Sequence, residues 1–135
     1  MKEEVILSIL PHKLREVFKR ENIDFQSIQE IRLRVGKPLI LLYKGSEVIP
    51  KVDGQIYHIT NEEIREMLDY ISGYSLYSYE RELSQGYITI EGGHRVGLSG
   101  QAIMENGKVK NLKYISSINV RMSHEILGCA DGLLP

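Results

Sequence analysis

Apolar and polar residues alternate in three separate segments of this chain, and this alternation constrains the fold more than any other feature. A β-strand places successive side chains on opposite faces, so an alternating segment is expected to be a strand with one buried and one exposed face. The segments cover residues 31–35, 94–104 and 116–122. They predict a sheet that is covered on one face only.

Short turn signals separate the predicted strands and favour a meander, in which the sheet is largely antiparallel. Gly36-Lys37-Pro38 and Lys44-Gly45 turn the chain in its first half, while Asp53-Gly54 and Asn106-Gly107 are two-residue hairpin signals. We expect the apolar run Leu39–Tyr43 to be a central strand. Further strands are predicted over residues 46–50, 55–59, 86–90 and 108–114.

Apolar residues also recur at helical spacing. In residues 3–20 this pattern is interrupted by Pro11, so we expect a short helix or turn before the proline and a second helix that begins at it. Thr60 and Glu63 have the spacing of a capping box, in which each side chain bonds the other residue's backbone amide. The helix that they open is expected to end at Gly73. Another helix is predicted over residues 75–85.

The length of 135 residues corresponds to one domain, since a domain typically has about 150 residues. With 42% hydrophobic and 26% charged residues, the composition is that of a folded chain and not of a disordered one. The alternating and helical patterns end near residue 122, and a glycine-containing tail follows. We therefore expect an α+β domain over residues 1–122 and a linker over residues 123–135.

Several classes of function are disfavoured. The net charge of −1 argues against nucleic acid as the main partner. Cys129 is the single cysteine, which excludes an internal disulfide and a cysteine-rich zinc module, and no two of the four histidines have i, i+4 spacing, so no metal site is expected. The sequence has neither an apolar run long enough to span a membrane nor a signal peptide at its start, so the cytoplasm is the expected location.

Four arginines occupy polar positions of the alternating segments. If helices cover the apolar face of the sheet, the four arginines share its open face, where a guanidinium can bind a phosphate or carboxylate through two parallel hydrogen bonds. The alternative is that they are ordinary solvent-facing strand residues that blunt the edges of a sheet. The four residues are Arg32, Arg34, Arg95 and Arg121.

Gly97-Leu98-Ser99-Gly100 has the GxxG form of a KH-type RNA-binding loop. Such a loop joins two helices, whereas the flanks of this segment alternate like strands, so RNA binding is a minor alternative. The chain has no G-x-x-x-x-G-K-[ST] motif and so cannot hold a nucleotide in the manner of a P-loop by itself.

Several segments, in their order along the chain, resemble the N-terminal part of the stage III sporulation protein AA family. More distantly, the layout is similar to the PAS-like N-terminal domain of type II and type IV secretion and pilus-retraction ATPases. The segments that carry the resemblance are 31–39, 75–89, 92–100, 115–121 and 128–131.

The resemblance implies a hexameric ATPase of an endospore-forming bacterium. It would act in the mother cell, at the membrane channel to the forespore, with membrane-anchored channel proteins as partners. ATP and magnesium would be held by a C-terminal P-loop domain, toward which Arg95 and Arg121 would reach, and this fragment alone would not be an enzyme. Arg32 and Arg34 would be possible anion contacts. The alternative is a stand-alone PAS-like module that binds a small ligand or a protein.

Overall fold

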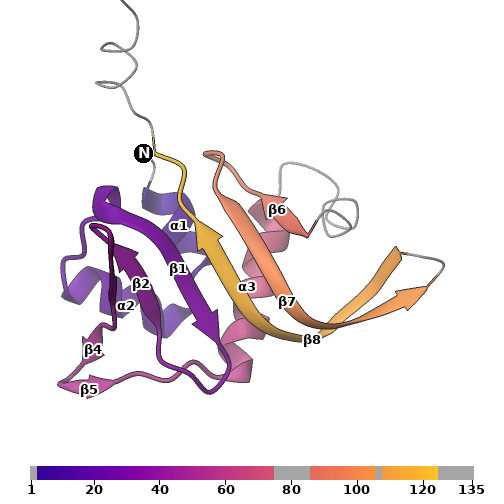
Figure 1. Ribbon diagram of the computed structural model, residues 1–135, viewed down its shortest axis with the longest axis horizontal. Helices are drawn as coiled ribbons and strands as arrows, with labels where there is room; N and C mark the ends of the chain where they lie inside the picture. Colours follow the sequence, from indigo (N-terminus) through magenta and orange to yellow (C-terminus); the bar gives the residue numbers. More distant parts are fainter. Residues whose placement is uncertain (1–2, 75–85, 106–107, 125–135) are drawn as a thin grey trace, which may run out of the picture.

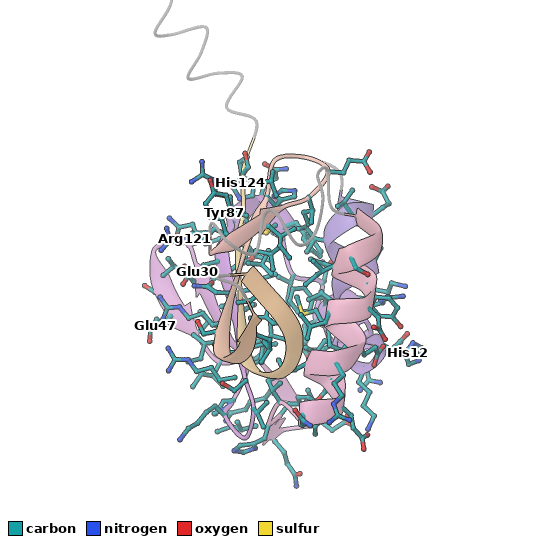
Figure 2. All side chains as sticks on the ribbon, turned by 90° about the vertical axis from the view of Figure 1, so that its right-hand side faces the viewer. His12, Glu30, Glu47, Tyr87, Arg121 and His124 are labelled. Carbon is teal, nitrogen blue, oxygen red and sulfur yellow. The ribbon has the colours of Figure 1, made fainter. Side chains whose placement is uncertain are left out.

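The computed structural model describes residues 3–74, 86–105 and 108–124, and it has the predicted α+β architecture (Figure 1). Six antiparallel strands form the main sheet in the order β3-β2-β1-β8-β7-β6. The helices lie on one face of this sheet, as both views show (Figures 1 and 2). The elements are α1 (Glu3–Ile9), α2 (His12–Arg20), a 3₁₀ turn (Phe25–Ser27), β1 (Ile28–Arg34), β2 (Ile40–Tyr43), β3 (Ser46–Val48), β4 (Lys51–Val52), β5 (Gln55–Ile56), α3 (Asn61–Tyr74), β6 (Tyr87–Thr89), β7 (Arg95–Glu105) and β8 (Lys108–Arg121).

The first two helices are separated as the proline predicts. α1 ends at Ile9, and Pro11 occupies the N-cap position of α2 with extended backbone angles. A proline has no amide hydrogen to leave unpaired at this position. α2 buries Leu14, Val17 and Phe18 against the sheet side of the molecule.

The predicted capping box opens α3. The Thr60 hydroxyl accepts a hydrogen bond from the Glu63 amide at 3.2 Å, and the Glu63 carboxylate accepts from the Thr60 amide at 2.9 Å. The same carboxylate accepts from the Tyr57 hydroxyl at 2.6 Å. Burial, the hydrogen bond to Glu63 and the negative charges of Glu63 and Glu66 together raise the pKa of Tyr57. The box therefore ties the start of α3 to the segment before it.

Three expectations about the strands are wrong. β2 is not central, because it lies second from the edge, and of its residues only Leu41 is buried. The Asp53-Gly54 turn forms as predicted, but its strands β4 and β5 make a separate two-stranded sheet. The segments predicted as two strands, 108–114 and 116–122, form one continuous strand, β8, which ends at Arg121. Its pairing with β7 continues past a register shift in which Ser116 of β8 is the extra residue.

The core lies between the helices and the apolar face of the sheet. Side chains from both layers form it, and those named below are at most 1% exposed. The sheet supplies this face from β1, β8, β7 and β6, and helices α1, α2 and α3 cover it. Its members include Ile6, Leu14, Phe18, Ile31, Leu33, Ile64, Met67, Ile88, Val96, Ile118 and Val120.

Some predictions fall on residues outside the described part of the chain. These are the helix at 75–85, the turn at Asn106-Gly107, Cys129 and the linker beyond His124. The strand ends on either side of the turn do pair, since Glu105 lies opposite Lys108. Within the described residues, no helix is both long enough and apolar enough to cross a membrane.

Candidate anion-binding face

The four arginines named by the sequence project from the uncovered face of the sheet, which we call the arginine face. The strand register decides this, because residues that pair across strands have side chains on the same face. In Figure 2, Glu30, Glu47, Tyr87 and Arg121 lie on this side of the sheet and His12 of α2 on the opposite side of the molecule. Three rows of paired residues cross it: Glu30–Arg121–Arg95, Arg32–Asn119–Gly97 and Arg34–Ser117–Ser99.

Arg95 and Arg121 are direct cross-strand neighbours on β7 and β8. Like charges placed opposite each other destabilise a sheet, so this pair is a local cost unless an anion lies between them. The Arg95 guanidinium lies over the Tyr87 ring, 4.9 Å from its centroid. The Arg121 side chain is 74% exposed, and among the described residues no hydrogen bond or ion pair is recorded for its terminal nitrogens.

Glu30 is a carboxylate in the middle of the arginine face, and sequence analysis did not select it. It accepts hydrogen bonds from Arg32 Nε and from Asn119 Nδ2, the latter at 3.3 Å, and it lies 3.4 Å from Arg121 Nε. Burial raises the pKa of this carboxyl, but the hydrogen bonds and the positive charges of Arg32 and Arg121 outweigh burial and bring the pKa below its usual value. Glu30 is therefore ionised and largely neutralised by its partners.

Arg32 and Arg34 differ in what they can still bind. Arg32 donates to Glu30 and also, through Nη1 at 2.8 Å, to Glu47, so two carboxylates hold it across β1, β2 and β3. These two ion pairs leave Arg32 poorly suited to binding an external anion. Arg34 is exposed and has no ion pair within the described residues.

Two neighbouring hollows lie on the arginine face and share Ser99, Asn119 and Arg121. The first has a volume of about 280 Å³, and among the described residues it is also lined by Gly86, Tyr87, Arg95 and Gly97. The second has a volume of about 400 Å³ and is also lined by Glu30, Arg32, Arg34 and Ser117. The arginine face thus combines guanidinium donors with space for a ligand.

Two histidines lie where β8 leaves the sheet. His94 is 1% exposed, and its Nδ1 accepts a hydrogen bond from the Ser123 amide at 2.9 Å. Burial and the neighbouring His124 lower the pKa of His94, so the neutral ring is favoured. Within the described residues, no group of three or more histidine, cysteine, aspartate or glutamate side chains could hold a metal ion.

The GxxG segment does not form the loop of a KH domain. Gly97 and Gly100 both lie within strand β7, which pairs with β8 on one side, whereas a KH loop joins two helices. The segment instead contributes Gly97 and Ser99 to the arginine face. Its glycines therefore have a different structural context from the one that the motif requires.

Comparison with known proteins decides the family. The model of the family described as sporulation stage III, protein AA, matches residues 1–135. The chain belongs to this family. Stage III sporulation protein AA of Bacillus subtilis (strain 168) is 39% identical over 132 residues, which is 98% of this chain and 40% of that protein. The chain thus spans about two-fifths of the length of the relative, and no solved structure gives a significant match.

Membership of the sporulation family confirms the resemblance seen in the sequence. The arginine face is made mostly by segments that carried that resemblance, since Arg32, Arg34, Arg95 and Arg121 lie in the first, third and fourth of them. Glu30, Tyr87, Gly97 and Asn119 were not selected as site residues. Glu30 alternates with Arg32, which could have placed it on the polar face, but its contact with Arg121 depends on the pairing of β1 with β8.

Proposed function

We propose that this domain is the N-terminal regulatory and assembly part of a hexameric sporulation ATPase, and that Arg95 and Arg121 contact the phosphates of a nucleotide held by a separate catalytic domain. The ATPase would act in the mother cell at the membrane channel to the forespore. ATP and magnesium would be bound mainly by the catalytic domain, whose P-loop would lie in a part of the longer protein that this chain does not cover.

The observation that carries the proposal is the placement of Arg95 directly opposite Arg121 on an uncovered sheet face. Two adjacent guanidinium groups repel each other in the sheet, but a bound anion converts their repulsion into two charge-assisted contacts. The recorded contact of Arg121 with Glu30, at 3.4 Å, is made by Nε and not by the terminal nitrogens. Both side chains are thus available to an anion that approaches from outside the sheet.

The chemistry expected of the pair is electrostatic. When a phosphoryl group is transferred, negative charge spreads over its oxygens and toward the leaving group, and a positioned arginine stabilises that charge. Magnesium, when bound by the catalytic domain, would neutralise part of the same charge. Toward the phosphates the 135-residue chain supplies only guanidinium groups, so by itself it is expected to bind a nucleotide weakly and to hydrolyse none.

The decisive experiment uses the longer protein that contains this chain. Arg95→Ala and Arg121→Ala are each expected to lower kcat for ATP hydrolysis by a factor on the order of 10³, which is the usual contribution of an arginine that stabilises phosphoryl transfer. Arg65→Ala is the matched control, because Arg65 is an exposed arginine on α3 in the helical layer. Normal hydrolysis in both test variants, with assembly unchanged, would contradict the proposal.

A simpler observation tests the same proposal. A G-x-x-x-x-G-K-[ST] motif in the part of the longer protein that follows residue 135 is expected, since a P-loop supplies the backbone amides that hold the phosphates. A following sequence without any nucleotide-binding motif would favour the stand-alone module.

A further inference from the structure

Gly97 lies in the interior of strand β7, although nothing in the fold requires a glycine there. Its φ angle is not in the left-handed region. A Cβ built on it would meet the Asn119 carbonyl oxygen at 3.9 Å and the Gly86 carbonyl oxygen at 4.0 Å, which is ordinary van der Waals contact among the described residues. Glycine weakens a strand, and in a strand interior it often marks a place where a ligand approaches closely.

The missing side chain leaves the 280 Å³ hollow of the arginine face open. Gly97 pairs with Tyr87 on β6 and with Asn119 on β8, so the hollow has an aromatic ring on one side and an amide on the other. Arg95 and Arg121 line the same hollow and lie two residues away from Gly97 and Asn119 along their strands, which is the next position on the same face. Apolar, amide and cationic groups therefore converge on one small volume.

Asn119, which lines the hollow, has a hydrogen-bond acceptor that no described residue bonds. Its Nδ2 donates to Glu30 at 3.3 Å, whereas its buried Oδ1 has no hydrogen-bond partner among the described residues. A buried acceptor without a donor is unfavourable, and a ligand that supplies one removes that cost. A fully ionised phosphoryl group has no such donor, so the phosphates of a nucleotide alone do not complete the site.

We propose that the hollow beside Gly97 receives a nucleobase with an exocyclic amine, that the Asn119 amide turns toward the hollow so that its Oδ1 accepts from this amine, and that the base packs against Tyr87. This inference rests on the proposed function, because the phosphates of the same nucleotide are the groups assigned to Arg95 and Arg121. Same-face positions along a strand are about 6.6 Å apart, so the long arginine side chains can reach phosphates that extend away from a base at Gly97.

The ligand test uses two pairs of nucleotides that differ at one group of the base. ATP and CTP carry an exocyclic amine where ITP and UTP carry a carbonyl oxygen. Binding is followed by NMR shifts of the backbone amides of Tyr87, Gly97 and Asn119 in the 135-residue chain, at ligand concentrations up to about 10 mM. The amine-bearing nucleotides are expected to bind about fivefold more tightly, which corresponds to one hydrogen bond.

Gly97→Ala tests whether a ligand needs the space that the absent side chain leaves in the hollow. It is expected to weaken ATP binding at least about fivefold and to abolish the preference for amines, while the thermal unfolding midpoint stays the same or rises. Gly73→Ala is the matched control, since Gly73 on α3 also has a φ outside the left-handed region and room for a Cβ. This control should leave binding unchanged.

The outcomes separate this inference from the proposed function. Equal binding of all four nucleotides, unaffected by Gly97→Ala but lost in Arg95→Ala, would overturn the base site and leave the phosphate role intact. Binding that persists in both Arg95→Ala and Arg121→Ala would overturn the phosphate role. Amide shifts that are absent at the highest concentration for every nucleotide would also overturn the base site.

Discussion

Arg121 Nε lies 3.4 Å from the carboxylate of Glu30, an almost completely enclosed group that is also held by Arg32 and Asn119. This one carboxylate organises the cationic side chains around it and leaves the outer end of Arg121 open. It is therefore expected to contribute both to the stability of the sheet and to the position of Arg121.

The variant Glu30→Gln tests this contribution. It keeps the shape of the side chain but removes the charge that Arg32 and Arg121 face, so the free energy of unfolding at pH 7 should fall by about 1–3 kcal/mol. Urea unfolding measures the change. Glu16→Gln, on the exposed side of α2, is the control and should change stability by less than about 0.5 kcal/mol.

The same variant should alter the response to acid. The pKa of Glu30 is lower in the folded chain than the ordinary value of 4.5, so its contribution is fully present above about pH 4.5 and is lost as the pH falls through the folded pKa. The stability difference between wild type and Glu30→Gln should therefore shrink at lower pH. The measurement extends to pH 2–3, about two units below the ordinary pKa of a glutamate. A difference in stability that stays constant over this range would contradict the assignment of the titration to Glu30.

The pairing of Arg95 with Arg121 predicts a repulsive coupling. We use a double-mutant cycle with Arg95→Gln and Arg121→Gln. Either substitution alone relieves the repulsion, so the second one raises the free energy of unfolding by less in the presence of the first than it does by itself. The coupling should be about 0.2–1 kcal/mol at low salt and smaller at 1 M salt, where charges are screened within about 3 Å. A zero or attractive coupling at low salt would mean that the two guanidinium groups do not repel each other.

His94 predicts a second pH dependence. Its lowered pKa means that folding favours the neutral ring, so its contribution is complete above about pH 6.5, the ordinary value, and declines as the pH falls toward the folded pKa. Protonation would also place a second N–H group against the Ser123 amide, which now donates to Nδ1. Wild-type stability should therefore decrease as the pH falls below 6.5.

Glu30→Gln should leave the loss of stability below pH 6.5 unchanged, whereas His94→Gln should abolish it. The variant is expected to be less stable than wild type at pH 7.5, because a buried ring is lost, and to show a flatter dependence between pH 7.5 and about 5. His12→Gln, an exposed histidine at the start of α2, serves as the control. An unchanged slope in His94→Gln would assign the titration to another group.

The parts of the fold that depend on local chemistry were predictable from the sequence. Pro11 separates two helices and the Thr60–Glu63 box opens α3, because both effects act within one turn of helix. The position of β2 was predicted wrongly. A continuous apolar run is typical of a central strand, but the order of strands in a sheet depends on pairings between distant segments, which the composition of one strand does not encode.

The candidate site was predictable in part for the same reason. The alternation of Arg32 and Arg34 with apolar residues, and of Arg95 and Arg121 in their segments, was enough to assign all four to one face once helices cover the other. The functional difference among them was not predictable. Arg32 is occupied by Glu30 and Glu47, and that follows only from the alignment of three strands.

The sequence alone determined which side chains face the core and which face outward, because the parity of a strand is a property of consecutive residues. The tertiary structure decided that Arg95 lies opposite Arg121, that Glu30 lies beside Arg121 on the next strand and that Gly97 opens a hollow between Tyr87 and Asn119. These relationships join residues that are far apart in the chain. They depend on register, which is fixed only when the whole sheet packs against its helices.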